Sequence, residues 1–245
     1  MRRSRKTDWM RRLVRENSLS SNDFILPIFV TEGKNKKIPI KTMPEVFRYS
    51  VDKLGQIVDR ALKLKIPMVA IFPQTNSGLK DSYGSEALNE NNLVCKAIRK
   101  IKDKYRNEIG IMTDVALDPY TSHGHDGILR NKRILNDETI EILIQQSLLQ
   151  AQMGSDVIAP SDMMDGRIGE IRQELDNNSL KDIKILSYAV KYASSFYGPF
   201  RDAVGSKKSL KGDKKTYQMD FSNSEEALRD CLLYTSPSPR DRNVS

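Results

Sequence analysis

One lysine of this sequence lies in a setting that could make its amine a nucleophile. Lys191 stands in the stretch SYAVKYASSFYGPFRDA (residues 187–203), just past an apolar run and among aromatic and small residues. Loss of hydration in such a pocket disfavours the charged ammonium, and a neutral amine can attack a carbonyl carbon to form a Schiff base. On position alone a solvated surface lysine is the simpler interpretation, because lysines are common in this chain.

The loop DVALDPYTSHGHDG (residues 114–127) gathers carboxylates and imidazoles densely enough to hold a divalent cation. Within nine residues lie Asp118, His123, His125 and Asp126. Their oxygen and nitrogen atoms are ligands for hard and borderline metals. The same side chains could instead bond to the backbone of their own loop, as polar loops commonly do. The residues alone leave both interpretations open.

Two basic clusters could attract acidic partners. Residues 1–16 carry seven basic side chains against two acidic ones, and residues 205–215 carry five lysines against one aspartate. Clustered lysine and arginine can neutralise nucleic-acid phosphates, but neither cluster has interleaved aromatic residues, and no nucleic-acid module is recognisable. A basic arm and a basic loop that receive a small acidic substrate explain the same charges. We therefore expect a small-molecule substrate and no nucleic-acid partner.

The elements that must position these residues are short apolar runs separated by helical segments. The runs, which predict strands buried on both faces of a parallel sheet, are residues 24–30, 68–72, 109–115, 156–159 and 183–187, with a sixth candidate near 216–219. Apolar residues recur at helical spacing in residues 54–64, 89–105 and 137–153. Such alternation of strand and helix is typical of βα repeats.

Two α/β architectures fit this alternation: a (β/α)8 barrel and an open doubly wound sheet. A doubly wound sheet normally carries a glycine-rich nucleotide turn after an early strand, and no such turn follows residues 24–30 or 68–72. Polar groups instead stand just beyond successive strands, namely Asp114, Ser161 and Lys191. Because a barrel assembles its active site from several strand ends, we predict a (β/α)8 TIM barrel. It is incomplete, with five to six βα units after an N-terminal arm at about residues 1–22.

Composition excludes several classes of protein. The chain has 245 residues, 38% of them hydrophobic, which is enough for a core and excludes wholesale disorder. No apolar run approaches the roughly 18 residues of a membrane span, and the charged start MRRSRKTDWMRR is no secretory signal. The two cysteines are too few for a disulfide framework. We expect a cytoplasmic protein with no membrane partner.

Six long motifs occur along the chain in a fixed order. They are RRLVREN (11–17), ILPIFV (25–30), DVALDPYTSHGHDG (114–127), PSDMMDGR (160–167), SYAVKYASSFYGPFRDA (187–203) and TYQMD (216–220). Together they resemble the porphobilinogen synthase (δ-aminolevulinic acid dehydratase) family from about residue 5 to about residue 230. The resemblance implies a (β/α)8 barrel with an extended N-terminal arm, usually a homooctamer. It also implies condensation of two 5-aminolevulinate molecules to porphobilinogen, with loss of two waters, on the route to haem.

The resemblance implies catalytic roles for three residues. Lys191 falls on one of two family lysines that form Schiff bases with the substrates, which replaces its interpretation as a surface lysine. Asp114 and Ser161 match polar groups near the bond-forming centre.

Three further residues match the family's substrate-binding positions. Arg201 and Lys214 match the pair that holds the carboxylate of the second-site substrate, although many relatives have arginine where Lys214 stands. That exchange keeps the charge but loses the planar fork of arginine. Gln218 matches a loop residue over the substrate, and residues 205–215 match a mobile lid.

The metal loop departs from the zinc-using branch of the family, which presents three cysteines where this chain has Ala116, Asp118 and Asp126. Thiolates favour zinc, whereas carboxylates favour Mg²⁺ or no tightly bound ion. We therefore expect Asp118 and Asp126 to be active-site loop residues without zinc. In the magnesium-responsive branch the ion is allosteric and is held partly by an acidic residue that matches Asp230.

The last fifteen residues do not follow the family pattern. After Asp230 the sequence CLLYTSPSPRD has no helical period, and two prolines in it would break a helix. It corresponds to one reading frame of a sequencing-library adapter, and the junction would turn a glutamate codon into Asp230. We therefore expect residues 1–230 to form an incomplete dehydratase barrel and residues 231–245 to be a non-native tail. This 245-residue chain is expected to be inactive.

Two other functions are compatible with parts of this pattern. A class I aldolase also uses a Schiff-base lysine on a barrel, but it has no reason for the pair Asp118 and Asp126 or for the block YGPFRDA. A non-catalytic barrel fragment is the second alternative, and the length of the chain supports it.

Overall fold

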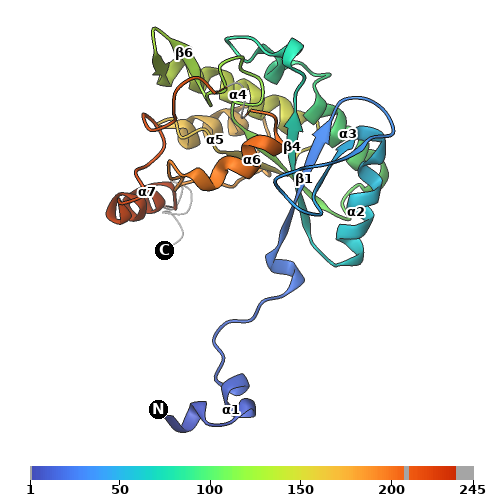
Figure 1. Cartoon of the computed structure of the whole chain (residues 1–245), viewed down its shortest axis with the longest axis vertical. Coiled ribbons are helices and arrows are strands. Elements are labelled where there is room, and N and C mark those ends of the chain that lie inside the picture. The colour runs from blue at the N-terminus through green and yellow to red at the C-terminus, as the bar shows by residue number, and fades with distance from the viewer. Residues whose placement is uncertain (1, 207–209, 236–245) are drawn as a thin grey trace.

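The computed structural model describes residues 2–206 and 210–235, which form a curved, mostly parallel sheet with helices outside it (Figure 1). The seven-stranded sheet has the order β2-β3-β1-β4-β5-β8-β9. All neighbouring strands are parallel except β2 and β3. The strands are β1 (Ile25–Thr31), β2 (Lys37–Pro39), β3 (Phe47–Ser50), β4 (Met68–Gln74), β5 (Gly110–Val115), β8 (Val157–Pro160) and β9 (Lys184–Ile185). A separate hairpin pairs β6 (Ile128–Arg130) with β7 (Arg133–Leu135).

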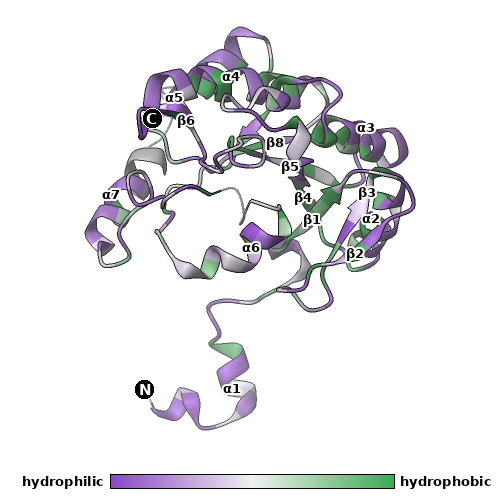
Figure 2. Ribbon diagram, turned by 45° about the horizontal axis from the view of Figure 1, so that its top comes forward, coloured by the Kyte–Doolittle hydropathy of each residue, from purple (hydrophilic) through white to green (hydrophobic). Residues whose placement is uncertain are grey.

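Helices follow the strands as expected for βα units. They are α2 (Leu54–Lys63), α3 (Leu93–Tyr105), α4 (Asn136–Gln152), α5 (Arg167–Asn177), α6 (Gly198–Ala203) and α7 (Ser224–Thr235). Figure 2 shows α2 to α5 around the outside of the strands and α6 on their other side. No helix among the described residues has both the length and the apolar character needed to cross a membrane.

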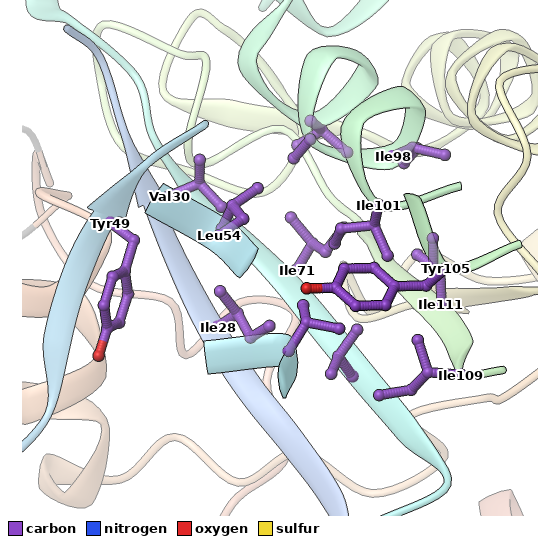
Figure 3. Packing of buried hydrophobic residues seen from close by; sticks show 14 of the residues in the cluster. Ile28, Val30, Tyr49, Leu54, Ile71, Ile98, Ile101, Tyr105, Ile109 and Ile111 are labelled. Carbon is purple, nitrogen blue, oxygen red and sulfur yellow. The ribbon is translucent and has the colours of Figure 1, made fainter. Parts of the chain in front are cut away.

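The core lies in two layers, one on each face of the sheet. Successive side chains of β1 point to opposite faces, so this strand contributes to both layers. Ile28 and Val30 pack outward with Leu54 of α2 and with Ile98 and Ile101 of α3 (Figure 3). The outer helices are held to the sheet by this apolar contact.

The inner face of the sheet packs against α6. Phe29 of β1 and Phe72 of β4 contact Phe200, with ring centroids 6.2 and 5.1 Å from the Phe200 ring. Ala203 and Val204 at the end of α6 are buried in the same cluster. The strands and α6 therefore enclose the space in which the ends of the parallel strands meet.

The predicted fold class is confirmed, and the sheet is an open one. All five expected strands occur, and the described residues form no closed barrel. The prediction of a sixth strand near residues 216–219 is wrong. Those residues turn back on themselves because the amides of Tyr217 and Gln218 both bond to the carbonyl of Lys214. Only an isolated parallel bridge joins Tyr192 to Met219.

The N-terminal arm lies away from the sheet (Figure 1). It contains a short 3-10 helix (Arg2–Arg5) and α1 (Asp8–Leu13), and neither has a buried residue. The arm ends where Ser20 and Asp23 form a capping box just before β1.

Helix α7 corrects one expectation about the tail. Residues 231–235 continue the helix that begins at Ser224, although the sequence there was expected to be non-helical. The acidic pair in its first turn suits the positive helix end, and the first proline comes only at position 237. The rest of the expected tail, residues 236–245, lies outside the described residues.

Candidate active site

Seven of the nine predicted site residues line one cavity of about 20 Å³. They are Asp114, Asp118, Ser161, Lys191, Arg201, Lys214 and Gln218, and two aromatic residues, Tyr197 and Phe200, complete the lining. These lining residues come from the ends of β5 and β8, from the segment after β9, from α6 and from the segment before α7. Convergence of strand ends and the segments that follow them is how a barrel builds an active site.

The ends of β5 and β8 fix the positions of Asp114 and Ser161. Asp114 pairs with Ala159 in the parallel register, and the Ser161 amide donates to the carbonyl of Val115 at 3.0 Å. Backbone pairing thus holds both side chains at the same edge of the sheet.

Asp114 titrates near neutral pH in this setting. Desolvation of its half-buried carboxyl group raises its pKa from the ordinary value to about 7, while the charge of Lys191 and a hydrogen bond with Ser161 act in the opposite direction. A carboxyl group that is half-protonated at neutral pH can both give and accept a proton during catalysis.

Lys191 is buried and points toward the strand ends. Its side chain is 9% exposed, and Nζ donates a hydrogen bond to the carbonyl of Ser161. Nζ also lies 5.9 Å from the centre of the Tyr197 ring. The backbone is held by the Met219 amide, which donates to the Lys191 carbonyl at 3.0 Å. This burial overturns the interpretation of Lys191 as a solvated surface lysine.

A second buried amine, Lys214, lies between the two carboxylates of the loop. Its Nζ is 2.8 Å from Oδ1 of Asp126 and 3.6 Å from Oδ2 of Asp118. Burial disfavours the Lys214 charge, but the two carboxylates outweigh burial and raise its pKa. The pKa of Asp118 is raised by burial. Burial acts to raise the pKa of Asp126, but the charges of Lys214 and Lys191 and its hydrogen bonds together outweigh burial and lower it.

The carboxylates of this loop do not fit a metal ion in this arrangement. The ammonium of Lys214 stands where a cation bridging Asp118 and Asp126 would stand. Across residues 2–206 and 210–235, no group of three or more histidine, cysteine, aspartate or glutamate side chains is placed to hold a metal.

The two histidines of the loop bond to protein groups. His125 lies 3.0 Å from the hydroxyl of Tyr217 through Nδ1 and 2.8 Å from the carbonyl of Lys211 through Nε2. His123 Nε2 lies 3.3 Å from the carbonyl of Ser82. Within the loop, the backbone amide of His125 donates to Nδ1 of His123 at 3.2 Å. The other partners of the two rings lie outside the loop, so the histidines are held by protein groups, but mostly not by their own loop.

Asp126 and Asp230 are the two predicted residues outside the small cavity. Asp126 lies behind it, in contact through Lys214. Asp230 lies in α7, on the wall of a larger cavity of about 630 Å³ that α7 shares with the β6–β7 hairpin. Gln218 lines both cavities. The structure therefore separates Asp230 from the reacting groups.

Two lining residues were missed as site residues. Tyr197 and Phe200 were noted only as apolar surroundings of Lys191, yet both line the cavity. The sequence could have indicated them, because three aromatic residues occur between positions 196 and 200, directly before Arg201.

Comparison with known proteins gives a consistent result. A family model described as delta-aminolevulinic acid dehydratase matches residues 1–236, which extends past Asp230, where the sequence analysis ended the family pattern. The dehydratase of Bradyrhizobium diazoefficiens is 57% identical over 232 residues, covering 95% of this chain and 65% of that protein. The dehydratase of Methanothermus sociabilis is 48% identical over 236 residues, covering 95% and 71%.

A solved structure agrees with the sequence comparison. The dehydratase of Toxoplasma gondii ME49, in complex with the reaction product porphobilinogen, superposes with a TM-score of 0.90 at 41% identity. The match covers 96% of this chain and 67% of that one, so the chain spans about two thirds of the length of these relatives. On the family match, the relatives and the fold together, the chain belongs to the delta-aminolevulinic acid dehydratase family.

Proposed function

We propose that the protein acts in porphobilinogen synthesis, the condensation of two 5-aminolevulinate molecules with loss of two waters. The observation that carries the proposal is the buried amine of Lys191 in one cavity with Asp114. Family membership supports it, because the Toxoplasma gondii relative was solved with porphobilinogen bound. Because the chain spans only 65% of the Bradyrhizobium relative, the proposal concerns the activity of the whole protein.

Lys191 forms a Schiff base with the ketone of one substrate molecule. Its Nζ bonds to the ketone carbon, and the ketone oxygen leaves as water together with the two hydrogens of the neutral amine. Asp114, with a pKa of about 7, relays a proton to the departing oxygen. Ser161 keeps Nζ in place through its carbonyl.

Arg201 and Lys214 bind the carboxylate of the substrate. Arginine offers a planar fork and lysine a compact charge. Because Lys214 is paired with Asp126 at 2.8 Å, the substrate carboxylate has to compete for it with Asp126. A cavity of about 20 Å³ holds about one water molecule, so the segment with Lys214 and Gln218 has to open before substrate enters.

Zinc has no part in this proposal, and Mg²⁺ acts at a distance from the cavity. The loop offers oxygen ligands, and those are held by Lys214. Asp230, which matches the family's allosteric magnesium position, is the residue that would contribute to holding Mg²⁺.

Self-association through the N-terminal arm is part of the proposal, with the homooctamer as the expected assembly. The arm exposes apolar side chains that the described parts of the chain, residues 2–206 and 210–235, leave uncovered: Trp9, Leu13 and Leu19 are 58%, 73% and 76% exposed. A second copy of the chain is the surface that would cover them.

Borohydride trapping tests the proposal. Reduction of the full-length protein during incubation with 5-aminolevulinate should leave Lys191 heavier by one substrate molecule less one oxygen atom, as read by peptide mass mapping. Lys191→Arg should abolish this adduct, because arginine stays protonated and cannot condense. Lys184→Arg, at an exposed lysine of β9, is the matched control and should label like the unchanged protein.

Two outcomes would overturn the proposal. One is absence of the adduct from Lys191 in the unchanged protein, which would favour a non-catalytic barrel. The other is equal labelling of the Lys191→Arg variant at another lysine. Cleavage of an aldol substrate without porphobilinogen formation would favour the class I aldolase.

A further inference from the structure

Helix α6 carries two of the residues that line the cavity, Phe200 and Arg201. At only six residues it is too short to be stable by itself, so its place depends on contacts with other elements. One group of contacts is aromatic and comes from Phe29 and Phe72. The other is polar and comes mainly from a single buried arginine, with an exposed threonine beside it.

That arginine is Arg48 of β3. Its Nε donates to the carbonyl of Ala203 at 2.6 Å, and its Nη2 donates to the carbonyl of Asp202. The Asp202 carbonyl also accepts a hydrogen bond from the Gly205 amide at 3.1 Å, and a guanidinium can bond to two carbonyls at a helix end at once. Arg48 thus bonds to the two residues that directly follow Arg201.

The position of Arg48 is itself fixed by the sheet. Arg48 pairs with Phe29 of β1 on one side and with Ile38 of β2 on the other. Its side chain is 9% exposed. Thr42, from the turn between β2 and β3, adds a hydrogen bond to the Asp202 carboxylate at 2.8 Å. The end of α6 is therefore attached to the β2–β3 unit at the edge of the sheet.

Stability alone gives a weak reason for a charged group here. Burying a guanidinium costs free energy, and an apolar side chain of similar volume often serves stability as well or better. The directional hydrogen bonds of Arg48 fix the rotation of α6 about its axis and its position relative to the strand ends. An apolar side chain cannot do this.

We propose that Arg48 is a positioning residue for substrate binding. It holds α6 so that Arg201 reaches the substrate carboxylate in the cavity that contains Lys191, while Arg48 itself does not line that cavity. This inference rests on the proposed function, and it assigns a binding role to the β2–β3 unit.

The first test measures how imine trapping at Lys191 depends on the concentration of 5-aminolevulinate. Arg48→Met should raise the half-saturating concentration by about tenfold or more, the factor that loss of charged hydrogen bonds gives. The plateau of labelling should stay unchanged, because Lys191 and Asp114 do not belong to α6. Arg48→Lys keeps the charge and one bond and should restore part of the binding.

Matched variants separate positioning from folding. Arg99→Met removes an arginine that donates to the carbonyl of Glu90, away from the cavity, and should leave the half-saturating concentration unchanged. Thr42→Val removes one bond to α6 at an exposed residue, so the chain should fold, and it should raise that concentration several-fold. A lower plateau at an unchanged half-saturating concentration in Arg48→Met and Thr42→Val would overturn the inference.

Hydrogen exchange gives a readout that does not depend on catalysis. The amides of residue 198 and residues 200–206 should exchange about tenfold faster in Arg48→Met than in the unchanged protein, and those of α3 should not change. If the unchanged protein traps no imine, the proposed function fails, and exchange still tests the attachment of α6. Equal exchange of residues 198–206 in both proteins would refute the role of Arg48.

Discussion

Asp114 lies half-buried at the end of β5, and desolvation of its carboxyl group raises its pKa to about 7. We expect the rate of imine trapping to show an inflection near pH 7, because the group changes there from proton donor to proton acceptor. Asp114→Asn should remove the inflection. Trapping rates measured between about pH 5 and pH 9 check this, and a retained inflection in the variant would assign it to another group.

The same pKa has a consequence for stability. The folded chain holds a proton on Asp114 that the unfolded chain releases near pH 4, so folding binds a proton between about pH 4 and about pH 7. The contribution of this group to the free energy of unfolding is therefore complete below pH 4 and is lost as the pH rises through 7. Urea titrations of Asp114→Asn should lack this decline.

Lys214 occupies the position between Asp118 and Asp126 where a cation would bind. We expect that removing metal with EDTA leaves imine trapping at Lys191 unchanged and that Zn²⁺ does not increase it. Metal analysis of the dialysed protein, alongside trapping, is the check. Loss of trapping in EDTA that stoichiometric Zn²⁺ reverses, and Mg²⁺ does not, would contradict this expectation.

At the scale of elements, the first residue of α5 is an arginine that bonds to two separate loops. Arg167 lies 3.1 Å from the carboxylate of Asp162, with both side chains fully buried, and it donates to the carbonyls of Met164 and Tyr188. Even beside this charge, burial raises the pKa of Asp162 to about 6. Arg167 therefore holds both the loop after β8 and the segment that leads to Lys191.

Arg167→Met should lower the free energy of unfolding by about 3–5 kcal/mol, because it leaves Asp162 buried without its partner. Urea denaturation measures the change. The double variant with Asp162→Asn should recover part of the loss, since the uncompensated charge is gone. A loss below about 1 kcal/mol in the single variant would show that water reaches Asp162.

The elements that the sequence predicted well are those whose signal is local. Continuous apolar runs predicted β1, β4, β5 and β8, because strands covered on both faces carry little else. Strand β3 was not predicted from the sequence, because its four residues, Phe47–Ser50, include an arginine and a serine and form no continuous apolar run. The burial of Arg48 depends on α6, which is about 150 residues later in the chain.

The candidate site was predictable to a similar extent. The strand-end residues Asp114 and Ser161 follow apolar runs directly, so their convergence was expected. The pairing of Lys214 with Asp126 depends on a contact across 88 residues, and nothing in the local pattern predicts it. The same is true of Arg48, whose type and neighbours resemble those of a surface arginine.

At the scale of the whole molecule, the arm offers a built-in reporter of association. Trp9 is the only tryptophan of the chain and is 58% exposed. If the arm packs on a second copy, Trp9 leaves water, and its emission should shift to shorter wavelength as protein concentration rises. Sedimentation over the same concentrations should show the larger species.

A variant with Trp9→Ala and Leu13→Ala should weaken association at least about tenfold, because apolar anchors carry much of the energy of an interface. Leu64→Ala, which changes an exposed apolar residue after α2, is the matched control. An emission maximum that stays constant while larger species form would place the interface elsewhere.

The small size of the cavity around Lys191 has a kinetic meaning. A space of about 20 Å³ admits roughly one water molecule, so substrate does not enter the closed form, and an opening step precedes every encounter. Raising the substrate concentration then accelerates imine formation only up to the frequency of opening, where the rate becomes independent of concentration.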